Sequence, residues 1–297
     1  HLVKAINDVT LVTPLTLVAT AILGAHRRGF LYTELLETVE ILIRFLNVHA
    51  IPMAASLGDS NRATQETLSL LITWKIVEVL EDVDQEEETF YFVEDDKKIE
   101  LEYYKNNIIH FFIPHALVAT SLLAGREAEK KLHTILEDYT FMKHLLKTEF
   151  LFDDEENEEQ KVRSVLDYFL KASFVSASQE EDAFKITRMG FDRLPAWASL
   201  TKTFLESYWI ATKAMGQQKN LALKDEALLK KMTYLGRRFH KLGVVDHIGA
   251  LSKLNFTNAV AVIQRDFLRR RPHKEQEPLE VLSQRSQRIY ELSRHGQ

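Results

Sequence analysis

Cysteine is absent from this sequence of 297 residues. Its absence excludes disulfide bonds, thiol nucleophiles, iron–sulfur clusters and cysteine-ligated zinc sites. Glycine and proline are scarce, with ten and six residues, and the signatures of serine hydrolases, zinc proteases and nucleotide-binding loops are missing. No methionine opens the chain, and residues 1–10 lack the basic and then apolar order of a signal peptide. We therefore expect a piece of a larger protein.

The charges are nearly balanced, with a formal net charge of -5 at pH 7. Hydrophobic residues make up 45% of the chain and charged residues 27%, values that are typical of soluble globular proteins. Binding to nucleic acid would need a basic surface, so we expect no nucleic-acid partner. A chain of this length is close to the upper limit for one hydrophobic core, which favours two modules.

Most of the sequence has the apolar spacing of α-helices. Thr13 before Pro14 predicts a capped helix that runs to Ala25, and a second helix is expected from Thr33. Further helices are predicted over 99–125 with a break near Pro114, and over 127–148, 162–171 and 193–216, the last with an internal proline. The last third predicts two or three more helices and a polar C-terminal tail.

Two long segments without charged residues, 9–25 and 108–125, approach the length of a membrane span. The first carries four threonines and a proline, and the second carries two histidines and a proline. Because these polar groups raise the free energy of membrane insertion, we expect both segments to be buried helices.

Two segments change to a strand-like pattern and predict β-hairpins with acidic tips, at 75–93 and 172–187. A helix, a hairpin and a proline-containing helix follow one another twice, which indicates a weak internal repeat. The predicted fold class is mainly α, a multi-helix array with two small β-hairpins, and winged-helix-like modules are one interpretation. Their acidic tips would repel phosphates, so such modules would bind proteins. The polar segment 153–160 predicts a division into modules 1–152 and 153–297.

Two patterns have the residue types of catalytic groups. His133 and Asp138 form an H-x4-D pattern, but positions five apart on a helix diverge by about 140°, so we interpret it as a chance match. Ser60 lies in the sequence GDSN, where glycine, aspartate, serine and asparagine are typical of a helix-capping turn. The histidines lack metal-ligand spacing, and we expect neither a metal site nor a cofactor.

Four segments together resemble a known family. They are VTPLTLVATAILGAHRRGF (12–30), LEYYKNNIIHFFIPHALVATSLL (101–123), FLESYWIA (204–211) and ALSKLNFTNAVAVI (250–263). In this order they resemble the region downstream of the catalytic domain in membrane-associated glycerol-3-phosphate acyltransferases and the related dihydroxyacetone-phosphate acyltransferases. The resemblance extends over about residues 5–265.

The resemblance implies a function without an active site in this chain. The family transfers an acyl group from acyl-CoA or acyl-carrier protein to the sn-1 hydroxyl of glycerol 3-phosphate. Its catalytic and phosphate-binding blocks precede the matched region. The resemblance therefore implies a non-catalytic C-terminal region whose partner is the N-terminal catalytic domain of the same protein. It further implies a peripheral location on the cytoplasmic face of a membrane, and a fragment that is soluble by itself.

Two other interpretations remain open at this point. The first is a stand-alone helical or winged-helix interaction module unrelated to lipids. The second is a complete enzyme that uses His133 or Ser60, which the local geometry argues against.

Two groups of residues are candidates for binding surfaces. The first is an unusual polar block within an aromatic helix, and consists of Tyr103, Tyr104, Lys105, Asn106, Asn107 and His110. Its amides either dock the catalytic domain or satisfy hydrogen bonds in the core, because buried amides without partners destabilise a fold.

The second group is a basic and apolar stretch near the C-terminus, and consists of Arg265, Phe267, Leu268, Arg269, Arg270 and Arg271. It is a candidate for peripheral contact with anionic lipid headgroups. The alternative is a solvated helix end whose cations are favoured by the helix dipole.

Overall fold

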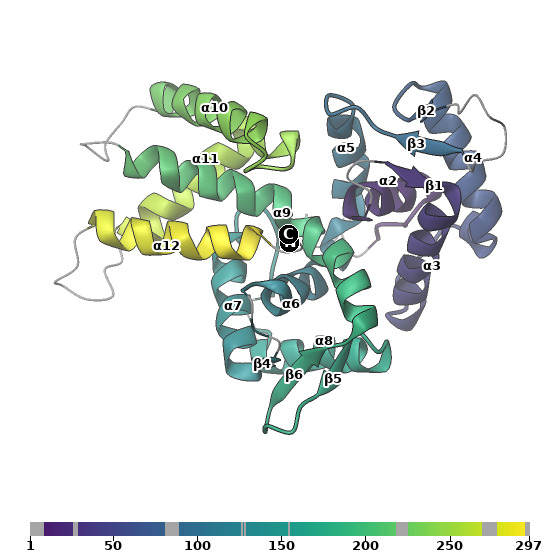
Figure 1. The fold of residues 1–297 in the computed structure, drawn as a ribbon, viewed down its shortest axis with the longest axis horizontal. Coiled ribbons are helices and arrows are strands. Elements are labelled where there is room, and N and C mark those ends of the chain that lie inside the picture. The colour runs from purple at the N-terminus through teal and green to yellow at the C-terminus, as the bar shows by residue number, and fades with distance from the viewer. Residues whose placement is uncertain are drawn as a thin grey trace. The chain divides into compact units, whose positions relative to one another are not determined.

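The computed structural model describes residues 9–25, 29–80, 89–125, 127, 129–153, 155–217, 225–268 and 278–294. Within these residues the fold comprises eleven α-helices and two small three-stranded antiparallel sheets (Figure 1). By their contacts, the residues divide into two compact units, His1–Ile113 and Pro114–Gln297. The predicted mainly α fold class is confirmed.

The first unit is built around its first described helix. In chain order its elements are α2 (Pro14–Ala25), β1 (Phe30–Leu31), α3 (Tyr32–Val48), the 3₁₀ turn η1 (Ala55–Gly58), α4 (Ser60–Thr73), β2 (Glu78–Leu80), β3 (Phe90–Phe92), α5 (Lys98–Ile108) and the 3₁₀ turn η2 (Ile109–Phe111). Nine of the twelve residues of α2 are buried, and this helix packs against α3, α4 and α5. The uncharged segment that contains α2 is therefore a core helix.

The start of α2 follows from two threonines. The backbone N–H of Thr16 donates to Oγ1 of Thr13 at 3.4 Å, and the backbone N–H of Thr13 donates to Oγ1 of Thr16 at 3.1 Å. These reciprocal hydrogen bonds satisfy N–H groups that the first turn of a helix leaves without partners. The helix predicted from Thr13 and Pro14 to Ala25 is confirmed.

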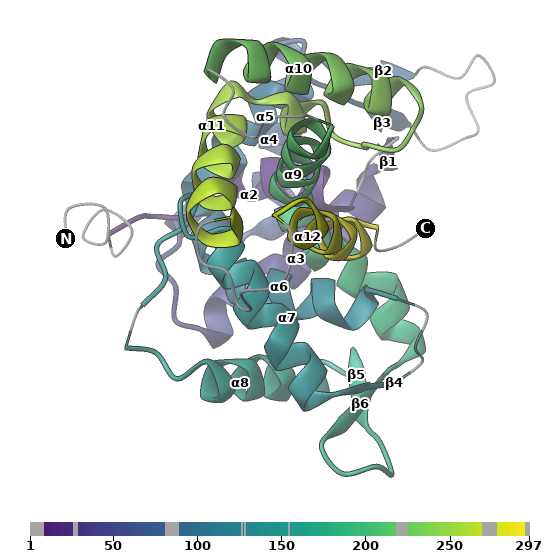
Figure 2. The same cartoon turned by 90° about the vertical axis from the view of Figure 1, so that its left-hand side faces the viewer.

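The second unit is built around one long helix. Its elements are α6 (Ile113–Leu123), β4 (Glu129–Lys131), α7 (Leu132–Leu145), α8 (Glu158–Lys171), β5 (Val175–Ala177), β6 (Ala183–Ile186), α9 (Arg188–Gly216), α10 (Asp225–Lys241), the 3₁₀ turn η3 (Ile248–Leu251), α11 (Lys253–Val262), the π-helical turn η4 (Ile263–Leu268) and α12 (Pro278–Ser293). Helices α10, α11 and α12 all pack against α9, as Figure 2 shows from one side. Helix α9 continues through Pro195, so this proline does not interrupt it.

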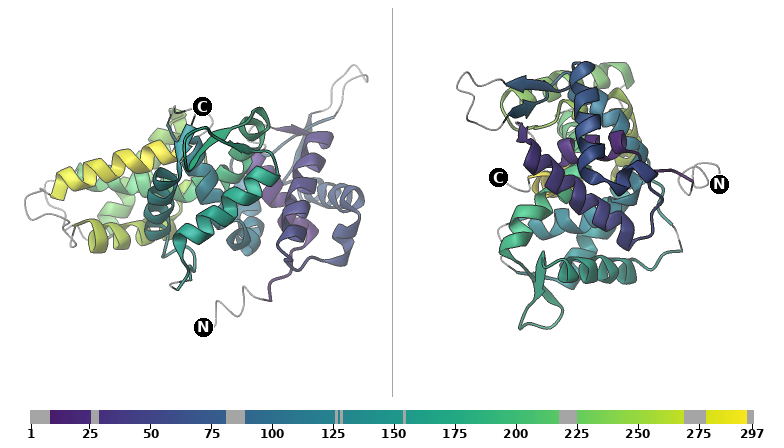
Figure 3. Two further views of the ribbon diagram at one scale, coloured as in Figure 1. Left: turned by 90° about the horizontal axis from the view of Figure 1, so that it is seen from below. Right: turned by 90° about the vertical axis from the view of Figure 1, so that its right-hand side faces the viewer.

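Both predicted hairpins are confirmed, and each gains a third strand. In the first unit β2 pairs with β3, and β1 joins the other edge of β3. In the second unit β5 pairs with β6, and β4 joins the other edge of β6. The hairpins can be followed in Figure 3 by their blue and teal colours. The edge strands β1 and β4 are only two and three residues long.

The two units share one order of elements. From α2 to α5 the first unit runs helix, strand, helix, helix, strand, strand, helix, and the second repeats this order from α6 to α9. The strand order recurs as well, because β1 and β2 flank β3 in the first unit as β4 and β5 flank β6 in the second, all antiparallel. The sequence PLTLVAT at the start of α2 matches PHALVAT within α6 at five of seven positions. Description of these units as winged-helix modules stays a prediction.

Helices α4 and α8 also end alike. Lys75 and Ser173, two residues after these helices, have φ angles of 56° and 60°. The next residues donate their backbone N–H groups to carbonyls five positions back, from Ile76 to Leu71 at 2.9 Å and from Phe174 to Phe169 at 2.8 Å. This hydrogen bond after a left-handed residue is the Schellman ending, which turns the chain from each helix into the hairpin.

The helical segment predicted over 99–125 does break near Pro114, into α5 and α6, and these helices belong to different units. Two other sequence predictions need correction. The helix predicted over 127–148 begins only at Leu132, because residues 129–131 form β4. The predicted polar tail contains α12, where Val281, Leu282, Ile289 and Leu292 are buried.

The division between the compact units lies at residues 113 and 114, not at the polar segment 153–160. The latter segment lies before and within the start of α8, inside the second unit. As limits of independently folding domains, 1–152 and 153–297 stay a prediction.

Candidate functional site

Helix α5 presents a mixed apolar and amide surface to solvent. Ile99, Tyr103, Asn106 and Asn107 are all exposed, and Tyr103 exposes 70% of its surface. Their spacing of four, seven and eight residues places them on one side of the helix. The opposite side, with Leu101 and Ile108, is buried.

This surface is extended by Leu70 of α4 and by Trp74, the C-cap residue of that helix. The ring of Trp74 stacks on that of Tyr104 with centroids 6.5 Å apart, and Tyr104 contacts Tyr103 edge to face at 5.5 Å. Leu70 lies one helical turn before Trp74, and both are exposed. We call the whole set the α5 face, and it consists of Leu70, Trp74, Ile99, Tyr103, Tyr104, Asn106 and Asn107.

Lys105 does not belong to this surface, although the sequence placed it in the docking block. Its side chain is buried, and Nζ forms an ion pair with Oε2 of Glu102 at 2.6 Å. Lysine is rarely buried so completely without a paired carboxylate. His110 is half-buried, with its ring 4.0 Å from that of Phe111. Of the predicted block, Tyr103, Asn106 and Asn107 are the exposed members.

Most of the basic stretch near the C-terminus lies outside the described residues. Arg269, Arg270 and Arg271 are not described, and neither are the side chains of Phe267 and Leu268. The remaining residue of the predicted patch, Arg265, is exposed. The role of this stretch stays a prediction.

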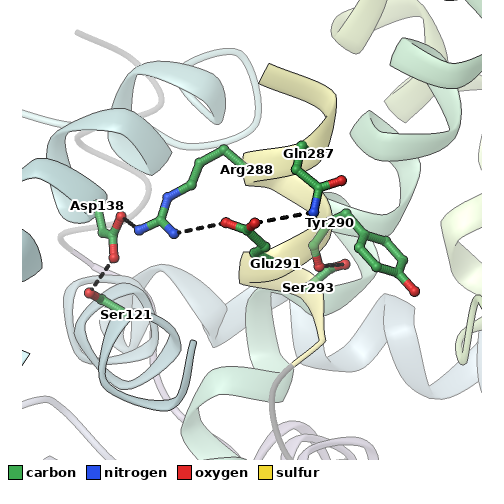
Figure 4. Close-up of polar contacts among 7 residues, drawn as sticks. All are labelled: Ser121, Asp138, Gln287, Arg288, Tyr290, Glu291 and Ser293. Atoms are coloured by element: carbon green, nitrogen blue, oxygen red, sulfur yellow. Dashed lines mark hydrogen bonds and ion pairs between the residues drawn. The ribbon is translucent and has the colours of Figure 1, made fainter. Parts of the chain in front are cut away.

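The H-x4-D residues do not come together. His133 is exposed in the first turn of α7, whereas Asp138 is buried with only 4% of its side chain accessible. Ser121 donates from Oγ to Oδ2 of Asp138 at 2.7 Å, and Arg288 of α12 pairs with Oδ1 (Figure 4). Asp138 therefore joins α6, α7 and α12, and it does not orient His133.

The sequence GDSN forms the predicted capping turn. Asp59 is the N-cap of α4, and Oδ1 accepts from the backbone N–H of Arg62 at 3.0 Å. Ser60 is the first residue of the helix, and its hydroxyl donates to Oε1 of Glu40 at 3.3 Å. Within the described part of the chain no histidine, the usual activating base of a serine nucleophile, is bonded to this hydroxyl.

Figure 4 shows how the Asp138 network continues along α12. Nη1 of Arg288 donates to Oε2 of Glu291 at 3.2 Å, and Gln287 donates to the other oxygen of Glu291 at 3.1 Å. The guanidinium of Arg288 thus lies between a buried and a half-exposed carboxylate. Such a charge-assisted network fixes the position of α12 on the second unit.

A second buried network joins α9 to the segment before η3. The carboxylate of Glu206 accepts from the backbone N–H groups of Asp246 and His247, at 2.8 and 3.1 Å. Lys202, one turn earlier on α9, is buried and pairs with Asp246. Burial raises the pKa of Glu206 to about 7, although the two N–H groups and Lys202 act in the opposite direction. These residues hold the chain after α10 against α9.

The described residues offer no other recognisable reaction centre. No group of three or more histidine, aspartate or glutamate side chains is placed there to hold a metal ion. Among these residues no single helix is both long and apolar enough to cross a membrane. Helices α5 and α6 meet that criterion only as a pair that is bent at its break.

Comparison with known proteins decides the family. Residues 1–270 match the family described as the glycerol-3-phosphate acyltransferase C-terminal region. The chain belongs to this family. The resemblance seen in the sequence is confirmed, and a module unrelated to the acyltransferases is not supported.

Individual relatives are longer than this chain. A glycerol-3-phosphate acyltransferase of Haemophilus influenzae is 24% identical over 258 residues, which are 86% of this chain and 31% of that protein. A Mycobacterium bovis protein named as an acyltransferase, plsB1, is 26% identical over 241 residues, or 79% of this chain and 38% of that protein. The chain thus spans about a third of the length of the curated relatives it matches.

The sequence carries no local signal that groups the exposed Trp74 with the α5 residues. Trp74 lies 29 residues before Tyr103, at the end of another helix. A local signal was present for Ile99, which precedes Tyr103 by one helical turn. The Arg288–Asp138 pair had no sequence signal, because 150 residues separate the partners.

Proposed function

We propose that this chain is the non-catalytic C-terminal region of a glycerol-3-phosphate 1-O-acyltransferase, and that its α5 face docks the catalytic region of the same protein. The reaction of the whole protein would be acyl transfer from acyl-CoA or acyl-carrier protein to the sn-1 hydroxyl of glycerol 3-phosphate. This is the first step of phospholipid synthesis, and the protein would act peripherally on the cytoplasmic face of a membrane.

One observation carries the docking proposal. An exposed tryptophan and an exposed tyrosine lie on one surface beside two exposed amides. Tryptophan and tyrosine are enriched among the residues that dominate protein interfaces, and amides supply the polar rim. The occupant is proposed to be the catalytic region because this chain matches only about a third of its relatives.

The reading frame that encodes this chain provides the first test. It should continue upstream of residue 2 into an H-x4-D block followed by phosphate-binding motifs. A stop codon or an unrelated domain there would contradict the proposal.

The isolated chain should show no acyltransferase activity. His133 is exposed and Asp138 is bonded to Ser121 and Arg288, so these residues cannot act as a base and its orienting group. The measurement is acyl transfer to glycerol 3-phosphate by the purified chain. Turnover that disappears in His133→Ala would show that the chain is an enzyme by itself.

Replacement of both Asn106 and Asn107 by alanine should change the stability of the isolated chain by no more than about 0.5 kcal/mol. Both side chains are exposed, so their removal leaves no buried group without a partner. The same change should weaken association with the separately purified catalytic region. Thermal unfolding and titration calorimetry measure the two effects.

Two exposed tyrosines provide a test variant and a matched control for this interface. Tyr103→Ala should weaken association with the catalytic region at least tenfold, as expected for a residue in the centre of an interface. Tyr234 of α10 is exposed to a similar extent, 66% against 70%, and Tyr234→Ala should leave association unchanged. Equal effects of the two substitutions, or none from Tyr103→Ala, would contradict docking on the α5 face.

A further inference from the structure

Helix α10 carries a cationic and apolar surface. Its inner side is fixed by Leu228, Met232 and Leu235, which are buried, and by Phe239, whose ring lies 4.8 Å from that of Trp209 in α9. Gly236 lies so close to Leu251 and Ile210 that an added Cβ would come within 3.0 Å and 3.3 Å of them. The orientation of α10 about its own axis is therefore determined.

The outer side of α10 combines positive charge with exposed apolar surface. We call it the α10 face, and it consists of Lys230, Tyr234, Arg237, Arg238, Lys241 and Leu242. Residues 227–245 contain five cations and no acidic residue, in a chain whose net charge is -5. Positive charge is thus concentrated on this helix.

Three of these cations form no ion pair among the residues that the structure describes. Lys230 pairs with Glu226 at 2.8 Å. Within the described residues, Arg237, Arg238 and Lys241 form no ion pair with a carboxylate, and the acidic residues of α10 are confined to its first two positions. An anionic partner would therefore meet three cations that form no ion pair within the described residues.

The exposed apolar residues indicate what kind of anion this is. Leu242 is exposed in the turn after α10, which His240 fixes by a hydrogen bond between Nδ1 and the carbonyl of Val245 at 3.0 Å. The helix dipole favours Arg238 and Lys241 in the last turn, but it does not account for the exposure of Tyr234 and Leu242 beside them. Because the apolar side of α10 packs against α9, a lipid surface would meet its basic side, where attraction to anionic headgroups is joined by the exposed apolar area of Tyr234 and Leu242.

We propose that the α10 face binds anionic membrane surfaces, with Arg237, Arg238 and Lys241 at the phosphate level and Tyr234 and Leu242 in the interface. This proposal rests on the peripheral membrane location in the proposed function and names the surface that makes the contact. It does not depend on docking by the α5 face, because vesicle binding is measured with this chain alone. It assigns the membrane contact to α10 rather than to the basic stretch at 265–271.

The test is partition of the chain onto vesicles of phosphatidylcholine and phosphatidylglycerol in equal parts, measured by flotation. Binding should be absent on pure phosphatidylcholine and should weaken as salt is added. The triple variant Arg237→Gln, Arg238→Gln and Lys241→Gln should lower the partition coefficient at least tenfold, because each basic residue near an anionic surface contributes about a fivefold factor. Tyr234→Ser with Leu242→Ser should lower it several-fold at unchanged charge.

A charge-matched control uses three exposed cations elsewhere, in the variant Lys75→Gln, Lys171→Gln and Arg188→Gln. This control and Tyr103→Ala should bind vesicles as the parent chain does.

The proposal is overturned if the parent chain does not bind the anionic vesicles, or if it binds neutral vesicles equally well. It is also overturned if the control loses binding as the triple variant does, or if only neutralisation of Arg269, Arg270 and Arg271 removes binding. Binding to a short single-stranded RNA without vesicle binding would assign the α10 face to nucleic acid instead.

Discussion

Replacement of Arg288 by alanine is expected to destabilise the chain by about 3 kcal/mol. The substitution removes the cation that pairs with Asp138. The carboxylate, whose side chain is only 4% accessible, would then keep the hydroxyl of Ser121 as its partner. Removal of one partner of a buried ion pair costs about 3–5 kcal/mol, and the lower end applies because 33% of the Arg288 side chain is accessible. Urea unfolding with linear extrapolation measures the change.

Two further variants separate this effect from the loss of an arginine as such. Addition of Asp138→Asn to Arg288→Ala should restore at least about 1 kcal/mol, because a neutral amide still accepts from Ser121 and leaves no buried charge. Arg62→Ala removes an arginine from an exposed pair with Glu66 and should change stability by less than about 1 kcal/mol. A loss in Arg288→Ala no larger than that in Arg62→Ala would show that the network does not hold α12 in place.

Glu206 should make the chain less stable as the pH rises from about 4.5 to about 7. Burial raises the pKa of this carboxyl in the folded chain to about 7, from an ordinary value of 4.5. The folded state therefore binds the proton more tightly than the unfolded state. Its contribution is fully present below the unfolded pKa and is lost as the pH rises through the folded pKa. The shift corresponds to about 3 kcal/mol.

Comparison of the parent chain with Glu206→Gln isolates this contribution. The groups near Glu206 that also carry charge are Lys202 and Asp246, and they are present in both proteins. The free energy of unfolding of the parent should fall between pH 4.5 and 7 relative to that of Glu206→Gln. Glu66→Gln, at an exposed position, should follow the parent. Parallel curves for the parent and Glu206→Gln would show that Glu206 does not titrate in this range.

The sequence predicted the features that depend on neighbouring residues. Helix α2 begins where Thr13 and Pro14 indicate, because the capping hydrogen bonds join residues three apart. The hairpins follow from strand-like patterns in pairs of short segments that are near one another in the sequence. Four segments in a fixed order indicated the resemblance to the acyltransferase family. The match of residues 1–270 to the family of glycerol-3-phosphate acyltransferase C-terminal regions confirms it.

The exposed amides of the α5 face were also within reach of the sequence. Asn106 and Asn107 are expensive to bury in an aromatic helix, and both are exposed. Lys105 lies four residues after Leu101 and three before Ile108, so the helical periodicity places it on the buried side of α5, away from the amides. Glu102, one turn away, provides the carboxylate that pairs with its buried ammonium group.

Only the tertiary structure decided where one unit ends and the next begins. The polar segment 153–160 has the composition of a boundary, yet the division lies in the uncharged segment near Pro114, where α5 ends and α6 begins a second copy of the element order. Strands β1 and β4 are too short to show alternation, and they form because a distant central strand supplies their hydrogen bonds. Asp138 and Arg288 pair across 150 residues for a similar reason. Local sequence determines helix starts, turns and exposed faces, whereas contacts between distant segments are selected by the packing of the whole unit.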